Sequence, residues 1–362
     1  MDKKFITKAS TMPDIVRIEL TNTCNLSCPH CRHHSSDKRI PKNYPEYYKN
    51  AYHISKEQIE HLFDEIGPYK PSVTLNVANE PMIAKNFKFA VEQLKKHGCA
   101  GTFNTNGLML NQEHCDFLVD QKYDSVNISI DATTPETLKK ARGITALDKL
   151  QRNVKRLIET RDKKNSIFPR VGVTFVIMPY NEKEIPEFIN YWKKFADVIR
   201  FTGYITDNRP DISVLPGIDT SKMPVRVPCK QIFRDIVIRA NGDVTPCVIT
   251  AESPHYYSMG NIFRDGGVEG VWNGKKFTEW RNKHNAKKWG DISYCKNCDY
   301  WVESFKPKET VTDEFIIKSP SPYTVFYNVK SRMGNWDKNR LVERQGFKND
   351  DFGVMDQIAA YD

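Results

Sequence analysis

The chain has 362 residues, of which 54 are Lys or Arg and 45 are Asp or Glu, giving a formal net charge of +9. Hydrophobic residues make up 39% and charged residues 27%, a composition of folded globular proteins that excludes a disordered chain. No apolar run approaches the roughly 20 residues of a membrane helix, and Met1–Ser10 is not followed by the apolar core of a secretory signal. We therefore expect a cytoplasmic protein without membrane partners. We do not expect nucleic-acid partners either, because the lysines lie mostly on predicted helix faces.

In chain order, short apolar strands alternate with amphipathic helices from residue 15 to residue 204. The expected strands are Ile15–Leu20, Ser72–Ala78, Gly101–Thr105, Ser125–Asp131, Arg170–Ile177 and Val198–Gly203. The expected helices are Ser55–Ile66 with Ser55 as its N-cap, Phe87–Lys96, Gln112–Gln121, Leu147–Arg161 and Glu182–Ala196. Strands joined by helices form parallel sheets with right-handed crossovers. The pattern predicts an α/β fold, a partial (β/α)6 barrel whose binding residues lie at the carboxyl ends of the strands.

The pattern changes after Tyr204. Residues 207–223 are rich in Pro, Asp and Ser and predict a linker. Beyond them, Asn241-Gly242 separates two alternating segments, Phe233–Arg239 and Asp243–Ile249, and predicts a β-hairpin. The expected organisation is a barrel over residues 1–206, a linker over 207–223, a small domain over 224–302 and a tail over 303–362. The aromatic residues of that tail favour packing as a cap over the main body.

The chain has nine cysteines, an odd number that we do not expect to form disulfides in a cytosolic protein. Cys99 and Cys115 stand alone in or beside predicted helices, where they are expected to be small buried hydrophobic residues. The other seven fall into two sets, which we name the first and second cysteine sets. The first set is Cys24, Cys28 and Cys31, and the second is Cys229, Cys247, Cys295 and Cys298.

The first cysteine set follows the first strand with the spacing C-x3-C-x2-C. Three thiolates so spaced can bind three irons of a [4Fe–4S] cluster and leave the fourth iron open to another ligand, with Pro29 helping to fix the turn. A structural zinc site is the alternative, and it requires a fourth ligand from His30, His33 or His34. The position directly after a strand favours the open cluster.

This loop resembles the signature of the radical S-adenosylmethionine (SAM) superfamily, and the resemblance extends over residues 15–204. The resemblance implies that SAM chelates the open iron. It also implies that an electron from the cluster cleaves SAM into a 5′-deoxyadenosyl radical, which abstracts hydrogen from the substrate. An electron donor such as flavodoxin or ferredoxin is then required. One departure is His30, where the family usually has an aromatic residue, although a planar imidazole can cover the adenine in a similar way.

Polar residues near later strand ends resemble the cosubstrate contacts of the same family. Residues 76–81 (NVANEP) stand where the family has a Gly-Glu-Pro signature, and Glu80 would accept a hydrogen bond from the methionyl ammonium. Asn79 replaces the glycine. The remaining candidates for the ribose or carboxylate of SAM are Asn106, Ser129, Asp131 and Arg142. Each candidate also has a structural interpretation as a cap, a turn or a surface residue, but their shared placement favours binding.

The second cysteine set has the pattern C-x12-G-x4-C, with the hairpin Gly242 inside it, followed by C-x2-C. This pattern resembles the auxiliary-cluster domain of the SPASM and twitch branches of the family. No cysteine follows Cys298, so the resemblance implies the shorter twitch form with one auxiliary cluster, and two [4Fe–4S] clusters in all. A four-cysteine zinc ribbon is the alternative.

A fully ligated second cluster can take an electron from a substrate radical, so the leading hypothesis is an oxidoreductase acting on a small polar molecule such as a sugar or aminocyclitol. The alternative is a maturase of a ribosomally made peptide or protein. Two observations favour the small molecule. Maturases often carry an N-terminal peptide-binding domain, whereas the first strand here begins already at Ile15. Sulfatase-maturing relatives have an aspartate where this chain has Val248. A third hypothesis is a non-catalytic zinc-ribbon binding protein. Tyr204 and Asp207, after the last strand, are the candidate catalytic residues. Dehydrogenation, epimerisation, deoxygenation and crosslinking all stay open.

Overall fold

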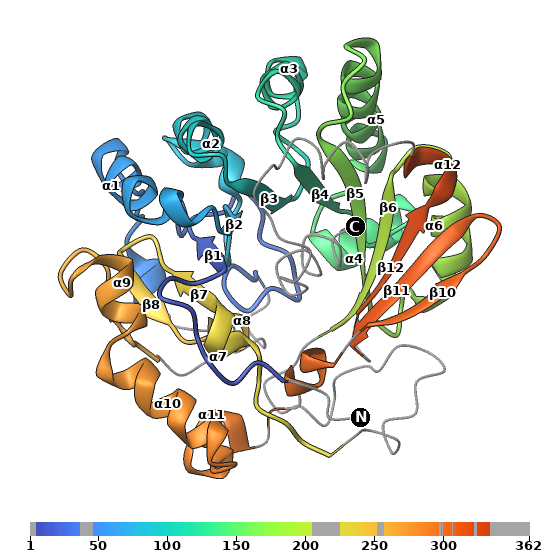
Figure 1. Cartoon of the computed structure of the whole chain (residues 1–362). Helices are drawn as coiled ribbons and strands as arrows, with labels where there is room; N and C mark the ends of the chain where they lie inside the picture. The colour runs from blue at the N-terminus through green and yellow to red at the C-terminus, as the bar shows by residue number, and fades with distance from the viewer. Residues whose placement is uncertain are drawn as a thin grey trace. The chain divides into compact units, whose positions relative to one another are not determined.

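The computed structural model describes residues 5–36, 46–204, 225–251, 257–296, 298, 300–305, 307–321 and 324–333. Within these ranges the chain forms two compact units, each with its own strands and helices (Figure 1). Unit 1 comprises residues 5–103 and 225–305, and unit 2 comprises residues 104–204 and 307–333. The expected linker over 207–223 lies outside the described residues. No described helix is both long enough and apolar enough to cross a membrane.

Unit 1 is built on three parallel strands, β1 (Ile15–Ile18), β2 (Ser72–Thr74) and β3 (Ala100–Thr105). The chain passes into unit 2 within β3, after Phe103. Figure 1 shows α1 (Lys56–Ile66) and α2 (Phe87–Lys96) side by side on the outer side of these strands. The predicted N-cap of α1 is confirmed, because Ser55 and Gln58 form a reciprocal capping box. The apolar face of α1 is buried as its periodicity predicts.

The small domain within unit 1 is joined to the first strand of the chain. Strand β7 (Asp235–Ile238) pairs in parallel with β1, and β8 (Asp243–Thr245) and β9 (Gly260–Asn261) continue the sheet antiparallel. Its helices are α7 (Gln231–Arg234), α8 (Val248–Ala251), α9 (Gly267–Trp272), α10 (Lys275–Asn285) and α11 (Ser293–Lys296). Because β1 and β7 are parallel, the loops that follow them leave from the same edge of the sheet.

The predicted hairpin is confirmed, but its strands are shorter than expected. The segment expected as Phe233–Arg239 begins in α7 and becomes a strand only at Asp235. The segment expected as Asp243–Ile249 ends its strand at Thr245, because Pro246 has no N–H for the ladder, and α8 follows. Gly242 occupies the turn with a φ of 85°.

Unit 2 contains the parallel strands β4 (Ser125–Ser129), β5 (Arg170–Ile177) and β6 (Val198–Gly203). Its helices are α3 (Gln112–Asp120), α4 (Pro135–Arg142), α5 (Leu147–Lys163) and α6 (Ile185–Trp192). Helix α4 was not among the predicted helices, although Thr134 caps it and Pro135 opens it. The helix expected from Glu182 begins instead as a 3-10 turn, and α6 starts at Ile185.

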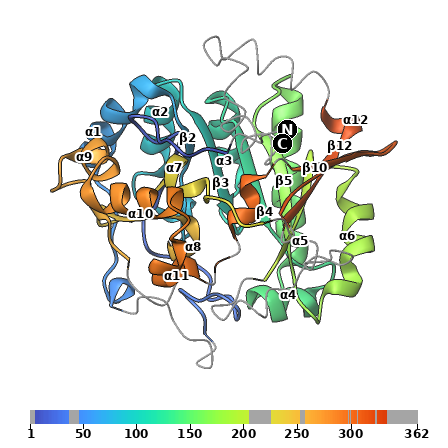
Figure 2. The same ribbon diagram turned by 60° about the horizontal axis from the view of Figure 1, so that its bottom comes forward.

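The described part of the expected tail forms an antiparallel extension of the unit 2 sheet. Strands β10 (Lys308–Val311), β11 (Phe315–Ser321) and β12 (Thr324–Val329) pair in sequence, and β12 pairs antiparallel with β6 (Figure 1). The short helix α12 (Lys330–Met333) follows β12 (Figure 2). Next to this junction, the buried Arg161 forms an ion pair with the buried Asp197. The Asp197 carboxylate also accepts a 2.7 Å hydrogen bond from the backbone of Val171, so this pair stays within unit 2.

Candidate functional site

The first cysteine set lies in a loop that leaves the carboxyl end of β1. The backbone N–H of Leu26 donates to the Cys24 sulfur at 3.4 Å, and the N–H of His34 donates to the Cys31 sulfur at the same distance. The backbone N–H of Cys31 donates to the carbonyl of Cys28 at 3.0 Å. Hydrogen bonds from backbone amides to cysteine sulfurs are one of the ways in which proteins stabilise and tune iron–sulfur clusters.

The electrostatics of this loop suit a cationic cluster. Burial raises the pKa of the Cys24 thiol to about 12, and the nearby Glu80, Cys28 and Cys31 act in the same direction against the Leu26 hydrogen bond. The Cys24 thiol becomes a thiolate readily only when a metal replaces its proton. No three His, Cys, Asp or Glu side chains in the described part of the chain converge on one single-ion position. Donors for a multi-iron cluster bind different irons and need not converge, and the three cysteines on one loop with amide hydrogen bonds to two of their sulfurs fit such a group.

Glu80 is placed beside the first cysteine set. It is 2% exposed, and its backbone N–H donates to the carbonyl of Thr23, the residue before Cys24, at 3.1 Å. Its carboxylate accepts a 3.2 Å hydrogen bond from the backbone of Met82 and caps a 3-10 turn. The predicted role of Glu80 toward the SAM ammonium stays a prediction; the structure places its buried carboxylate next to the segment that leads into Cys24.

The second cysteine set comes from four places in the small domain. Cys229 precedes α7, Cys247 lies between β8 and α8, Cys295 is in α11, and Cys298 follows that helix. Burial raises the pKa of Cys229, of Cys295 and of Cys247, the last to about 11, and other cysteines of the set raise each of these values further. The four thiols are therefore close enough to interact and, like the first set, fit a group that brings positive charge.

Two side chains that the sequence analysis did not consider border the second cysteine set. Nδ1 of His284 accepts a 3.2 Å hydrogen bond from the backbone N–H of Cys229, and burial lowers the pKa of His284 to about 4. The imidazole is therefore neutral, with its proton on Nε2. The Arg226 guanidinium donates to the carbonyls of Cys295 and Lys296. His284 therefore fixes the backbone of Cys229, and Arg226 fixes the backbone of Cys295.

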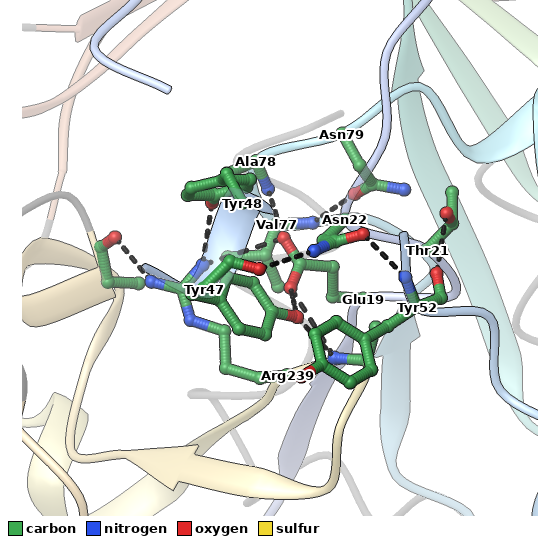
Figure 3. A network of polar contacts seen from close by, with 12 residues as sticks. Glu19, Thr21, Asn22, Tyr47, Tyr48, Tyr52, Val77, Ala78, Asn79 and Arg239 are labelled. Carbon is green, nitrogen blue, oxygen red and sulfur yellow. Dashed lines mark hydrogen bonds and ion pairs between the residues drawn. The ribbon is translucent and has the colours of Figure 1, made fainter. Parts of the chain in front are cut away.

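A buried polar network, which we name the Glu19–Arg239 network, lies at the edge where β1 and β7 end. Figure 3 shows the carboxylate of Glu19 facing Tyr47 and Arg239, and Tyr48 beside them. The Tyr47 hydroxyl donates to Glu19 at 2.6 Å, and the Arg239 guanidinium lies 3.5 Å from the same carboxylate. Glu19 is 0% exposed and Arg239 is 1% exposed, so a complete ion pair is held away from water.

The remaining cosubstrate candidates lie in unit 2. The Asn106 carboxamide accepts a 3.1 Å hydrogen bond from the backbone of Leu108 in the turn after β3, and Ser129 ends β4. Asp131 is fully buried and forms an ion pair with Arg142. Burial raises the pKa of Asp131, while Arg142 opposes that rise. The roles of these four residues toward SAM stay predictions.

The other residues that the sequence singled out have simple outcomes. Tyr204 follows β6 and is half-buried, whereas Asp207 lies outside the described residues, so neither candidate catalytic role is tested. Cys99 and Cys115 are 2% and 0% exposed, which confirms that they are buried.

The Glu19–Arg239 network was not among the features predicted from the sequence. A signal for it was present, because Glu19 and Arg239 are each a charged residue directly after an apolar strand. A charged side chain in that position is rarely fully buried unless it has a partner. The pairing of the two residues could not be read from either segment alone.

Comparisons with protein-family models identify two segments. The model described as the radical SAM superfamily matches residues 18–191, which include the first cysteine set and Glu80. The SPASM model, described as an iron-sulfur cluster-binding domain, matches residues 229–299, which include the second cysteine set.

Curated relatives match most of the chain at low identity. Mycofactocin maturase MftC of Mycobacterium tuberculosis is 24% identical over 322 residues, covering 77% of this chain and 75% of the relative. The tungsten-containing aldehyde ferredoxin oxidoreductase cofactor-modifying protein of Pyrococcus furiosus is 23% identical, covering 73% and 82%. GTP 3',8-cyclase of Limosilactobacillus fermentum is 24% identical and covers 86% of each chain.

Solved structures share the fold. The structure of anSMEcpe with bound AdoMet superposes with a TM-score of 0.55 at 15% identity, covering 96% of this chain and 98% of that one. SuiB of Streptococcus suis bound to its precursor peptide SuiA gives a TM-score of 0.57 at 12% identity, covering 75% and 67%. The α/β fold class expected from the sequence, with its small C-terminal cluster domain, is confirmed.

Proposed function

The chain belongs to the radical SAM superfamily and carries a C-terminal SPASM iron–sulfur domain, and from this premise we propose that it is a maturase that abstracts hydrogen from a peptide or protein. One observation carries the proposal: similarity to mycofactocin maturases extends over 77% of this chain and 75% of the relative, a longer stretch than the radical SAM segment 18–191 alone. SuiB, which shares the fold, has been solved with a precursor peptide bound.

This proposal reverses the order of substrate classes that the sequence analysis favoured. The preference for a small polar molecule depended on the early strand at Ile15 and on Val248 beside Cys247. Both signals concern segments flanking the site and carry no information about the shape of a substrate pocket. The relatives support the peptide alternative better.

The two cysteine sets would hold clusters with different roles in the reaction. When bound, SAM and the two clusters supply single-electron chemistry, the first cluster for cleaving SAM and the second for accepting an electron from the substrate. Cys24, Cys28 and Cys31 would hold the first cluster, and Glu80 would orient SAM through its ammonium group. A cytoplasmic location and an electron donor such as flavodoxin or ferredoxin belong to the proposal, because free thiols persist in a reducing compartment.

A small-molecule substrate is the second candidate. It is favoured by the similarity to the GTP 3',8-cyclase of Limosilactobacillus fermentum, whose name specifies a nucleotide substrate. That alignment covers 86% of this chain and 86% of the relative. The two candidates share the radical SAM chemistry and differ only in what binds opposite SAM.

Co-expression with each short reading frame beside the gene tests the substrate class. We expect one peptide product to lose hydrogen atoms in a mass spectrum when the wild-type enzyme is present, and to stay unchanged with Cys28→Ala. SAM-dependent formation of 5′-deoxyadenosine, coupled to consumption of a sugar or nucleotide while every peptide stays unmodified, would instead establish the second candidate.

A further inference from the structure

The Glu19–Arg239 network joins segments that carry ligands of both cysteine sets. Glu19 lies between β1 and Cys24, and Arg239 lies between β7 and Cys247. Both belong to unit 1, and they are separated by 220 positions in the chain. The pair therefore connects the stem of the first cysteine loop with the stem of the hairpin that presents Cys247.

Glu19 contacts the loop that resembles the family's SAM-binding signature. One carboxylate oxygen accepts from the backbone N–H of Ala78 at 3.4 Å, and the other accepts from the backbone N–H of Ala240 at 3.4 Å. The carbonyl of Ala78 lies 2.8 Å from Nε2 of the His34 ring. The backbone N–H of His34 donates to the Cys31 sulfur. The peptide two residues before Glu80 is thus held on one side by Glu19 and on the other by the first cysteine loop.

Arg239 contacts the helix that follows Cys247. Its Nη2 donates to the carbonyl of Ala251 at 2.6 Å, and the backbone N–H of Ala251 donates to the carbonyl of Cys247 at 3.2 Å. Its Nη1 donates to the Tyr48 hydroxyl at 3.2 Å, and the Tyr48 ring lies 5.2 Å from the His34 ring, centroid to centroid. An unbroken series of contacts therefore runs from Cys247 through Arg239 and Tyr48 to His34 and Cys31.

A buried ion pair is weak evidence for stability, because removing two charges from water offsets most of their attraction. What a multiply bonded buried pair does provide is a fixed geometry for the backbone groups around it. Here those groups belong to the Ala78 loop and to α8, the segments next to Glu80 and Cys247. The placement of the pair therefore favours a positioning role.

We propose that Glu19 and Arg239 are positioning residues that couple the second cysteine set to the loop that would receive SAM. When the second set binds its cluster or loses cysteines, α8 shifts. Arg239, which is bonded to both α8 and Glu19, then shifts Glu19 and the backbone of Ala78. SAM binding at the first set then depends on the state of the second set, although the two sets share no ligand. This inference concerns the coupling of the two sets and holds for either substrate class.

The test compares the double variant Glu19→Gln/Arg239→Met with the matched control Asp197→Asn/Arg161→Met, which removes a buried ion pair in unit 2. Hydrogen–deuterium exchange of the peptide covering residues 76–82 is measured without SAM, and the Kd for SAM is measured on the reconstituted protein. We expect faster exchange and a Kd raised roughly tenfold in the Glu19/Arg239 variant only, as for other residues that orient ligand-bearing groups. Equal effects in both variants, or none in either, overturn the proposal.

Coupling itself is tested by adding Cys295→Ser/Cys298→Ser to the wild type and to the Glu19/Arg239 variant. In the wild-type background we expect these changes to speed exchange of residues 76–82, and in the variant background to add nothing further. Additive effects contradict the coupling. If the double variant does not fold, Tyr48→Phe, which removes one hydroxyl, decides the question: an unchanged Kd for SAM then overturns the proposal. None of these measurements requires a peptide substrate, so they fail or succeed separately from the proposed function.

Discussion

Arg142, the last residue of α4, forms an ion pair with Asp131, a fully buried residue that follows β4 with a φ of 65°. The Asp131 carboxylate also accepts a 2.6 Å hydrogen bond from the backbone N–H of Val176 in β5. Asn181 adds a 3.0 Å hydrogen bond to the Asp131 carbonyl. Two residues predicted separately as SAM contacts therefore bind each other and fasten the ends of β4 and β5.

Arg142→Met is expected to destabilise the protein by about 3 kcal/mol, because it leaves the buried Asp131 carboxylate without its counter-charge. Asp131→Asn/Arg142→Met should recover a large part of that loss, since no charge is left unpaired and asparagine tolerates the left-handed backbone. Urea unfolding of the single and double variants measures both. A double variant no more stable than Arg142→Met would show that the pair is not the source of the effect.

The sequence predicted what depends on local spacing and periodicity. The C-x3-C-x2-C loop, the Asn241-Gly242 turn and the buried face of α1 all depend on residues within one element, and the structure has each of them. The partner of Glu19, by contrast, lies in a distant part of the chain. Glu19 and Arg239 are 220 positions apart, and no local pattern reports which buried carboxylate meets which guanidinium.

Glu80→Gln is expected to weaken SAM binding by roughly tenfold while leaving the fold intact. The amide oxygen of glutamine can still accept from the backbone of Met82, so the 3-10 cap survives, but the charge that would attract an ammonium group is lost. Equilibrium dialysis with SAM and a thermal melt separate the two effects. Binding as tight as in the wild type would remove Glu80 from the SAM site.

Gly242→Ala is expected to destabilise the small domain and to lower the iron bound by the second cysteine set. Gly242 has a φ of 85°, and an added Cβ would lie 2.3 Å from the Phe263 ring. Since Cys247 follows this hairpin directly, a distorted turn displaces one of its ligands. Gly290→Ala is the matched control, because nothing lies within 4 Å of a Cβ at that position. Iron content and the melting temperature are measured for both, and equal losses would exclude a role for the turn.

The reconstituted protein is expected to bind about eight irons, four for each of two [4Fe–4S] clusters. Cys295→Ser/Cys298→Ser should reduce this to about four irons while leaving the first cluster in place, because Cys24, Cys28 and Cys31 lie in a different loop. Cys99→Ala and Cys115→Ala are the matched controls. Cys99 is buried in unit 1 and Cys115 in unit 2, and neither belongs to a cysteine set. Each variant should keep about eight irons. Iron, sulfide and zinc are counted on anaerobic samples. About four irons with one zinc in the wild type would contradict the auxiliary cluster and establish a zinc ribbon at the second cysteine set.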